Sequence, residues 1–206
     1  PDYTALVAWL GRSDADIIAL QEITPQSVLA LESLAQAYPY RKVIPRDDPY
    51  GIALLSRWPI DAVLSMDFAE DGLPSLVANL DVHGRKLQVI ALHTRWPVLP
   101  GLQLARDRAL QQAAAHAFTR PEATILLGDL NLTPYAPAFA RLVAESGLRD
   151  AAAGEAWRPT WQADFWPLAL PIDHVLVPRR GCITGHEIGP DVGSDHRPLQ
   201  VTLRLP

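Results

Sequence analysis

The sequence predicts a mixed fold of the α/β or α+β type, in which β-sheets pack on each other and helices lie around them. Three observations predict it. The β-rich segments are bunched in two groups with helical segments between them. Of the 206 residues, 49% are hydrophobic, which suffices for a full core. There is no GxGxxG sequence after a predicted strand and no P-loop, so a doubly wound parallel sheet that binds nucleotide phosphates has no support.

The N-terminal segment is predicted to form a helix, a strand and a second helix. In 2–10 (DYTALVAWL) apolar residues recur at helical spacing, and Gly11 is expected to end the helix. The segment 14–23 (DADIIALQEI) has the continuous apolar run of a strand that is buried on both faces. Thr24 followed by Pro25 is typical of an N-cap and a first-turn proline, so the second helix begins there.

From residue 40 to 93 the pattern changes to short β-rich segments, which predict a meander. These segments are 40–44, 51–56, 60–66, 74–82 and 85–93. The pair His83–Gly84 is typical of the turn that would join the last two segments into a hairpin.

The second half repeats the alternation of helices and strands. The Ala/Leu/Gln-rich segment 102–118 predicts a helix, and ATILLGDLN (123–131) predicts a second buried strand. Thr133 and Pro134 indicate the start of another helix, which Gly147 would end. Three further strands are predicted at 172–177, 182–188 and 198–205. Because the chain contains no internal linker or repeat, we expect a single domain over 1–206.

Composition excludes several classes of protein. The net charge is −5 and only two of the 18 cationic residues are lysines, which argues against a dedicated duplex-DNA binder but leaves open a groove lined by arginines. The single cysteine, Cys182, cannot form an intramolecular disulfide and has no partners at zinc-ligand spacing. No apolar run approaches the ~18 residues that a membrane span needs.

Polar residues with catalytic potential fall at the ends of the predicted strands. They are Glu22, His93, Asp129, Asn131, Asp173, Asp195 and His196. Asp129 and Asn131 are two residues apart, so in an extended chain both side chains point to one face. Carboxylates, an amide and imidazoles together suit Mg²⁺-assisted chemistry on phosphate esters, in which oxygen ligands hold the ion and a histidine moves protons.

Other interpretations of these residues have less support. Zinc is disfavoured because the histidines lack paired spacing such as HExxH, and a serine hydrolase because there is no GxSxG and Ser194 to His196 are consecutive. Taken singly, Glu22 and Asp173 are also compatible with strand-end carboxylates that face water. Asp129 and Asn131 are compatible with turn residues that cap local backbone groups.

Six motifs in order resemble those of the endonuclease/exonuclease/phosphatase family, which has a deoxyribonuclease I-like fold. They are DIIALQE (16–22), GIALLSRWPI (51–60), VIALHT (89–94), ILLGDLN (125–131), IDHVL (172–176) and GSDHRP (193–198). The resemblance covers nearly the whole chain. It implies a four-layer sandwich with two central, mostly antiparallel β-sheets flanked by helices. It also implies hydrolysis of a phosphodiester or phosphomonoester that depends on Mg²⁺ or Mn²⁺.

The resemblance assigns metal-binding and histidine roles to four residues. Glu22 resembles the family's metal-binding glutamate, and Asp195 resembles the second metal carboxylate. His196 is similar to the histidine that acts as general base or contacts the phosphate. Asp173 matches the carboxylate that orients that histidine.

Three further residues match positions of the family that contact the reacting phosphate. Asp129 resembles the aspartate that orients the attacking water or serves the leaving group, and Asn131 resembles the amide that holds a phosphoryl oxygen. His93 is similar to a phosphate-contacting histidine. The implied chemistry is in-line attack of an activated water on phosphorus.

The resemblance also predicts a segment upstream of this sequence. The family opens with a strand that ends in a catalytic asparagine, so we expect that strand upstream of Pro1. Bacterial relatives with an N-terminal region like DYTALVAWL often carry membrane helices before the catalytic domain. This leaves open a soluble domain that is tethered outside the cytoplasm, and no obligate protein partner is evident, so we expect a monomer.

The loop 157–171 (WRPTWQADFWPLALP) is the best sequence clue to the substrate. Its Trp161 is expected to anchor the loop, while Trp166, with Arg57, Arg95 and Trp96, is expected to line the site. Such aromatic residues could stack on a nucleic-acid base or contact a lipid. We therefore expect a nuclease-like phosphodiesterase. Two alternatives stay open, a lipid or small-molecule phosphodiesterase or phosphatase, and a catalytically idle binding module.

Overall fold

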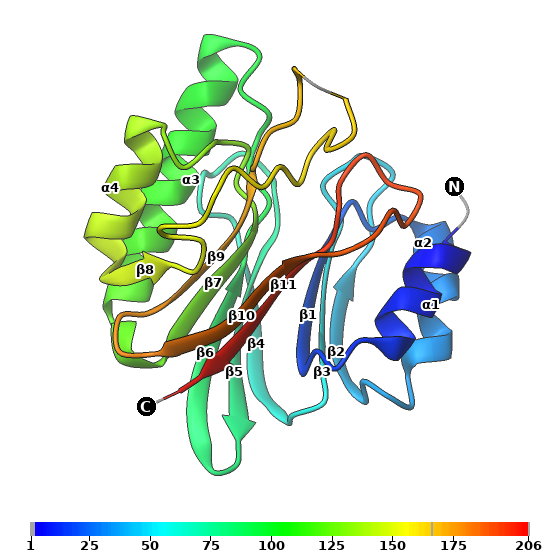
Figure 1. Ribbon diagram of the computed structural model, residues 1–206. Coiled ribbons are helices and arrows are strands. Elements are labelled where there is room, and N and C mark those ends of the chain that lie inside the picture. The colour runs from blue at the N-terminus through cyan, green and yellow to red at the C-terminus, as the bar shows by residue number, and fades with distance from the viewer. Residues whose placement is uncertain (1–2, 166, 206) are drawn as a thin grey trace.

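The computed structural model describes residues 3–165 and 167–205 (Figure 1). The helices are α1 (Thr4–Arg12), α2 (Pro25–Leu31), α3 (Pro100–Phe118) and α4 (Pro137–Ser146), with short 3-10 turns at Glu32–Leu34 and Pro121–Ala123. The strands are β1 (Ile17–Gln21), β2 (Tyr40–Ile44), β3 (Ile52–Ser56), β4 (Ile60–Met66), β5 (Ser75–Val82), β6 (Arg85–Ala91), β7 (Thr124–Asp129), β8 (Leu148–Asp150), β9 (Asp173–Pro178), β10 (Cys182–Ile188) and β11 (Leu199–Arg204). No described helix is long and apolar enough to cross a membrane.

The strands form a six-stranded sheet, a three-stranded sheet and a two-stranded ribbon. The large sheet has the order β4-β5-β6-β7-β9-β8, the small sheet has the order β1-β3-β2, and β10 pairs with β11. Every pairing is antiparallel except that of β6 with β7. Figure 1 shows α3 and α4 on the outer face of the large sheet and α1 and α2 on the outer face of the small sheet. The predicted four-layer arrangement is confirmed.

Three apolar clusters hold these layers together. One lies between the large sheet and α3 with α4, and includes Leu110 and Leu142. A second, which includes Leu10 and Ile18, packs the small sheet on α1 and α2. The third joins the inner faces of the two sheets, where Leu54 of β3 is part of the same cluster as residues of β5 and β6. Burial of these side chains supplies most of the free energy that stabilises the sandwich.

The 40–93 region is divided between the two sheets and is not one meander. β2 and β3 pair with β1, whereas β4, β5 and β6 belong to the large sheet. The hairpin between β5 and β6 forms as expected, because His83 and Gly84 both have positive φ, 54° and 79°, as a type I′ turn requires.

Several helix boundaries differ from those predicted, and α3, for example, begins at Pro100 rather than at residue 102. α1 includes Gly11 and ends at Arg12, where the backbone N–H of Ser13 donates to the carbonyls of Trp9 and Leu10. α4 begins at Pro137 because Ala136 N–H donates to Thr133 O and closes a separate turn first. Its predicted end is confirmed, since Gly147 has the left-handed conformation (φ 71°) of a helix C-cap.

The sheet pairing gathers the ends of several strands at one edge, which is the upper end in Figure 1. Antiparallel pairing of β7 with β9 sets Asp129 opposite Asp173. Parallel pairing of β6 with β7 brings the segment after β6 to the same place, where Thr94 N–H donates to Asp129 O at 3.1 Å. The strand-end residues of the sequence therefore meet in space.

Candidate active site

Gly128 determines how β7 reaches the site. Its φ is 139°, and a Cβ at this position would lie 1.9 Å from the carbonyl oxygen of Leu92. Only glycine therefore lets β7 pass so close to the end of β6. The next residue, Asp129, is almost fully buried, with 5% of its surface exposed.

Asn131 holds the Asp129 carboxylate in a fixed orientation. Its backbone N–H donates to Asp129 Oδ1 at 2.8 Å, and its side-chain Nδ2 donates to Asp129 Oδ2 at 3.2 Å and to Thr94 O at 2.9 Å. The backbone of Asn131 is left-handed, with φ 48°, which asparagine tolerates better than most residues. The turn of residues 129–131 thus both caps local backbone groups and fixes the Asp129 carboxylate at the site.

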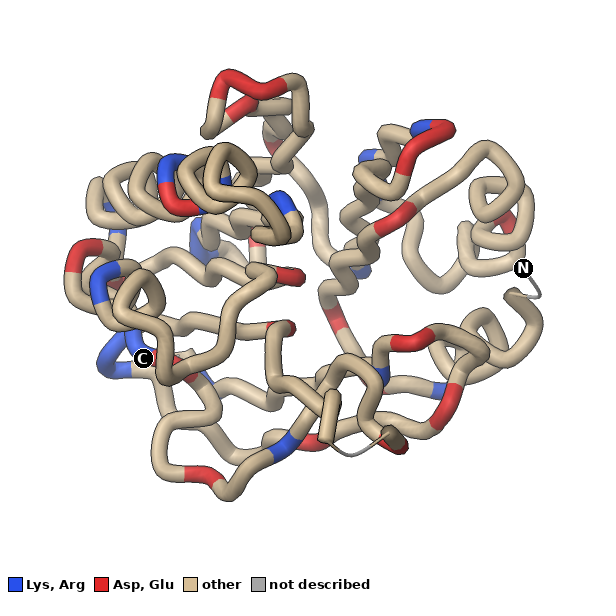
Figure 2. The backbone as a smooth tube through the Cα atoms, turned by 90° about the horizontal axis from the view of Figure 1, so that it is seen from above, with Lys and Arg blue, Asp and Glu red and all other residues tan. Residues whose placement is uncertain are grey.

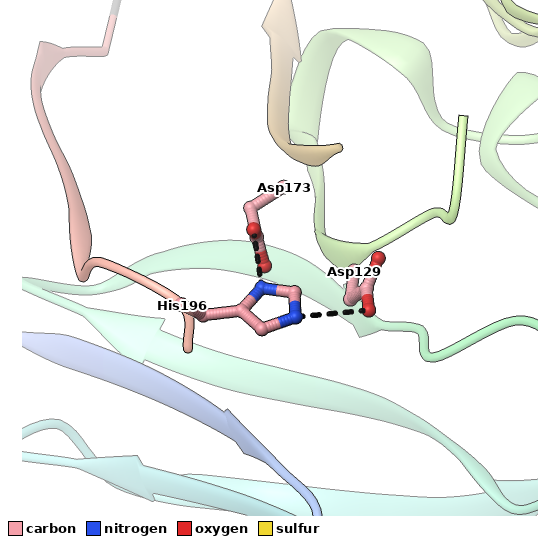
Figure 3. Close-up of side chains that lie close together, drawn as sticks. All are labelled: Asp129, Asp173 and His196. Carbon is pink, nitrogen blue, oxygen red and sulfur yellow. Dashed lines mark hydrogen bonds and ion pairs between the residues drawn. The ribbon is translucent and has the colours of Figure 1, made fainter. Parts of the chain in front are cut away.

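His196 lies between two carboxylates (Figure 3). Its Nδ1 is 2.8 Å from Asp173 Oδ2, and its Nε2 is 3.9 Å from Asp129 Oδ2. Burial opposes a charge on the ring, but the hydrogen bond to Asp173 and the surrounding carboxylates raise the pKa of His196 to about 9. In the absence of metal the imidazole is therefore protonated at neutral pH and can donate a hydrogen bond from Nε2.

His93 faces the same carboxylate from the other side. Its Nε2 lies 3.5 Å from Asp129 Oδ2, and its ring packs on Tyr50 with the ring centroids 5.2 Å apart. Burial lowers the pKa of His93 to about 4, so this imidazole stays neutral. Burial and the charge of Asp173 also raise the pKa of Asp129 well above its ordinary value. At neutral pH, His196 is thus protonated and His93 is neutral.

Glu22 and Asp195 bring two more carboxylates to this edge. Glu22 follows β1 in a left-handed conformation with φ 57°. Burial raises the pKa of Glu22, and the negative charges of Asp195 and Asp173 raise it further, while His196 lowers it. Asp195 Oδ2 accepts a hydrogen bond from Trp161 Nε1 at 2.9 Å. Figure 2, seen from above, shows acidic residues on segments of both halves of the molecule.

The donor set suits a hard divalent cation. Oxygen ligands from carboxylates are those that Mg²⁺ and Mn²⁺ prefer, and a cation would relieve the repulsion that raises the pKa of Glu22. Asp129, Asp173 and His196 also present ligand atoms that all lie within 4.8 Å of one another. Because Asp173 and His196 are hydrogen-bonded to each other, Glu22 and Asp195 are the better candidates to hold the ion.

Comparison with known proteins decides the family. The family model described as "Endonuclease/Exonuclease/phosphatase family" matches residues 1–196. The chain belongs to the endonuclease/exonuclease/phosphatase family. This chain is a phosphoric ester hydrolase, and enzymes of its family generally use a divalent metal. A search of curated proteins found no match.

Solved structures with the same fold have several recorded activities. D. rerio TDP2 in complex with a single-strand DNA product is 20% identical, with a TM-score of 0.76, and the match covers 97% of this chain and 90% of that one. Sphingomyelinase C from Streptomyces griseocarneus is 18% identical, with a TM-score of 0.65 and coverage of 94% and 89%. The mannosyl-6-phosphatase Bt3783 of Bacteroides thetaiotaomicron is 19% identical, with a TM-score of 0.71 and coverage of 98% and 90%. At these identities the likeness shows the fold alone.

The seven strand-end residues expected from the family resemblance all lie at this edge. Of the residues expected to bind substrate, only some lie near it. Arg95 donates to Asp71 and lies 4.7 Å from the Tyr50 ring, next to His93, and Trp96 is 58% exposed. Arg57 follows the far end of β3, donates to the carbonyls of Ser13 and Asp14 and packs over Tyr38, so the structure does not bring it to the site. Trp166 lies outside the described residues.

Three residues beside the candidate site were not predicted as functional residues. Trp161, expected only to anchor its loop, also donates to the Asp195 carboxylate. Thr160 Oγ1 accepts from the backbone N–H of Asp173 at 3.2 Å, which fixes the start of β9. Gln21 Nε2 is buried without a hydrogen-bond partner among the described residues. A polar residue directly before Glu22 was the one sequence signal that could have singled out Gln21.

Proposed function

We propose that this chain hydrolyses a phosphodiester with the help of Mg²⁺ or Mn²⁺, by attack of a water on phosphorus. The observation that carries this proposal is the placement of His196 between Asp173 and Asp129, 2.8 Å and 3.9 Å away, with Glu22 as an electrostatic neighbour. One fixed proton donor beside several carboxylates is the arrangement that metal-assisted phosphoryl transfer to water requires.

Each residue has a distinct role in the proposed reaction. Asp173 holds the His196 ring by its Nδ1, so that Nε2 donates to a phosphoryl oxygen and stabilises the charge that develops there. In its ionised form, Asp129 accepts a proton from the attacking water as the P–O bond to the leaving alcohol breaks, and the pKa that burial raises makes this carboxylate a stronger base. Glu22 and Asp195 would hold the metal ion, which supplies further neutralisation of the phosphoryl charge.

Neutral His93 and Asn131 complete the proposed site. His93 Nε2 lies 3.5 Å from the Asp129 carboxylate and can contact a substrate oxygen without adding charge. Asn131 keeps the Asp129 carboxylate in place through two hydrogen bonds. Both residues thus reduce the reorganisation that would otherwise accompany the transition state.

Charge favours a diester over a monoester. A phosphodiester carries one negative charge, whereas a phosphomonoester at neutral pH carries about −1.5 to −2. Several carboxylates face the site, and Arg95 already pairs with Asp71 at 2.8 Å. A dianionic group therefore meets more repulsion here than a monoanionic one.

A lipid or small-molecule phosphodiester is the second candidate, and exposed aromatic residues favour it. Tyr135, four residues after Asn131, stacks on Trp157 with the ring centroids 5.8 Å apart, and both residues are exposed, 75% and 42%. Trp96, three residues after His93, is 58% exposed. Such rings can contact an apolar leaving group.

Hydrolysis assays test both candidates. We would assay the protein with Mg²⁺ or Mn²⁺, with and without chelator, on bis(p-nitrophenyl) phosphate, supercoiled plasmid, single-stranded oligonucleotides, and sphingomyelin or phosphoinositide vesicles. Metal-dependent turnover that His196→Ala and Asp129→Asn abolish, but His116→Ala on α3 retains, supports the proposal. The substrate that reacts distinguishes a nuclease from a lipid phosphodiesterase. A folded protein that binds metal but turns over none of these substrates would contradict the proposal of phosphodiester hydrolysis.

A further inference from the structure

α3 packs on the large sheet through an apolar face that carries one charged residue, Arg106. The other buried residues of the helix are Ala109, Leu110, Ala113, Ala114 and Ala117. Alanine and leucine suit such a face because they bring no polar group into the interior. Arg106 is nearly as enclosed, with only 8% of its surface exposed. A buried guanidinium costs free energy unless its donors are paired, so its presence on this face needs a specific reason.

The donors of Arg106 are shared between its own helix and the turn that follows β7. Nε and Nη2 donate to Asp107 Oδ1 at 3.0 Å and 2.7 Å. Nη1 donates to the backbone carbonyl of Asn131 at 3.2 Å, across 25 residues of sequence. Asp107 therefore fixes one side of the guanidinium, and the other side is left to bind the turn.

The carbonyl of Asn131 depends on this side chain for its hydrogen bond. Residues 130–133 belong to no helix or strand, and within the described part of the chain no backbone N–H donates to Asn131 O or Leu132 O. Backbone carbonyls that are shielded from water require a donor. Arg106 supplies one to Asn131 O, and His174 Nε2 supplies one to Leu132 O at 2.9 Å. Side chains from two other elements thus hold the turn in place of backbone hydrogen bonds.

Asn131 is the residue of this turn whose placement matters most for the site. Its left-handed backbone, with φ 48°, is disfavoured even for asparagine, so it persists only where the surroundings hold it. The same residue donates to both oxygens of the Asp129 carboxylate, at 2.8 Å and 3.2 Å. A shift of Asn131 would therefore reorient the Asp129 carboxylate.

We propose that Arg106 is a positioning residue of the candidate active site. Its guanidinium fixes the Asn131 carbonyl, and through Asn131 it fixes the carboxylate of Asp129. Among the described residues its side-chain hydrogen bonds go to Asp107 and to Asn131 O, so Arg106 is not itself a catalytic residue. This inference rests on the proposed function, in which Asp129 accepts a proton from the attacking water.

A positioning role and a structural role predict different effects of an apolar replacement. A buried ion pair rarely adds stability over an apolar side chain of similar size. In Arg106→Met the remaining partner, Asp107, is left without its cation, but its side chain is 26% exposed and can be hydrated. The variant is therefore expected to keep its stability and to lose the fixed turn. A structural role predicts the reverse.

Kinetics on bis(p-nitrophenyl) phosphate with Mn²⁺ give the first test. In Arg106→Met, kcat is expected to fall about tenfold or more with KM little changed, because a displacement of about 1 Å at a reacting group can cost about a hundredfold. Arg106→Lys keeps a donor of similar reach and is expected to recover a large part of this loss. Arg108→Met is the matched control, since Arg108 lies on the same helix, is half-exposed and pairs with Glu70. It is expected to leave kcat unchanged.

Measurements on the metal-free protein give a second test that does not depend on turnover. The thermal midpoint of Arg106→Met is expected to stay within about 4 °C of the wild type. Hydrogen exchange followed by NMR is expected to be about tenfold or more faster at the Asn131 N–H and unchanged at the Ala113 N–H of α3. If the wild type hydrolyses no substrate but exchange changes in this way, the proposal of hydrolysis fails and the positioning of Asp129 by Arg106 is supported.

Asp107→Asn keeps the inference testable if Arg106→Met does not fold. It removes the charge that orients Nε and Nη2 but leaves the guanidinium in place. The Asn131 N–H is then expected to exchange faster than in the wild type, whereas exchange at Ala113 stays the same. Unchanged exchange at Asn131 in this variant would count against the role of Arg106.

Three results would overturn the proposal. Wild-type kcat and wild-type exchange at Asn131 in Arg106→Met would show that the guanidinium does not hold the turn. Equally faster exchange at Asn131 and Ala113, with a thermal midpoint lower by more than about 10 °C, would show that Arg106 only stabilises the packing of α3. The same loss of kcat in Arg108→Met would show that the effect comes from the charge of the helix and not from the contact with Asn131.

Discussion

At the scale of single residues, the contact between Asp173 and His196 determines the charge of the site. The pKa of His196 is about 9 in the folded protein, above its ordinary 6.5, because the hydrogen bond and the nearby carboxylates outweigh the effect of burial. A histidine with a raised pKa contributes stability that is fully present below pH 6.5 and is lost as the pH rises through 9. A titration of His196 must therefore extend well above neutral pH.

We predict that Asp173→Asn lowers the pKa of His196 by more than about one unit, because it removes both the charge and the charged hydrogen bond. Histidine ring titration followed by NMR in the presence of EDTA measures this directly. Between pH 6.5 and 9 the free energy of unfolding should fall with pH in the wild type and fall less in the variant. Asp61→Asn, at a carboxylate on β4 that pairs with Lys86, is the control. An unchanged His196 midpoint in Asp173→Asn would contradict the assignment.

Trp161 is predicted to act as a positioning residue for Asp195. Its indole N–H donates to the carboxylate at 2.9 Å, so Trp161→Phe keeps the ring but removes the donor. Loss of such a supporting hydrogen bond typically weakens metal binding about 10–100-fold. Isothermal titration with Mn²⁺ measures the effect, and the thermal midpoint without metal should change little. Trp157→Phe, at an indole that stacks on Tyr135 instead, should leave the affinity unchanged.

The difference between predicted and observed site residues has a physical cause. Asp129, Asn131 and His196 carry their chemistry in their own side chains, and their position next to strands is visible in the sequence. Trp161 and Gln21 affect the site only through the residues that they contact in the folded chain. Those neighbours come from distant segments, as Asp195 does for Trp161, so no local pattern reveals them.

At the scale of elements, the approach of β7 to the end of β6 depends on Gly128. We predict that Gly128→Ala destabilises the protein by more than about 3 kcal/mol, because the Cβ would lie 1.9 Å from Leu92 O and backbone cannot move aside cheaply. Gly154→Ala is the matched control, since its φ is also positive (88°) but nothing lies within 4 Å of the added Cβ. That variant should cost only about 1–2 kcal/mol. Equal urea midpoints for the two variants would show that the close approach does not matter.

Element boundaries were predictable where local chemistry fixes them. The turn at His83–Gly84, the Thr24 cap of α2 and the Gly147 end of α4 follow from residues that favour those conformations. The assignment of β2 and β3 to one sheet and β4 to another was not predictable. Both alternatives give the same local strand pattern, and only long-range pairing decides between them.

The whole molecule places the candidate active site where the two halves meet. Glu22 comes from the small-sheet half, Asp129 and Asp173 from the large sheet, and Asp195 from the loop before β11. A cation at this place would therefore link separate layers. The fold follows from the ordered motifs, but the substrate does not, because it depends on exposed rings such as Tyr135 and Trp157 whose arrangement arises only in the folded chain.

This arrangement predicts that metal binding stabilises the entire fold. Ligand at about 100 times its Kd stabilises by about 2.7 kcal/mol, which for a chain of this size raises the thermal midpoint by roughly 5–10 °C. Calorimetry with and without Mg²⁺, and with EDTA added back, measures the shift. Glu22→Gln should melt close to the metal-free wild type and gain little from Mg²⁺. Glu145→Gln, at an exposed position on α4, should respond as the wild type does. An undiminished gain in Glu22→Gln would place the ion instead at Asp129, Asp173 and His196, where the ligand atoms also lie within reach of one cation.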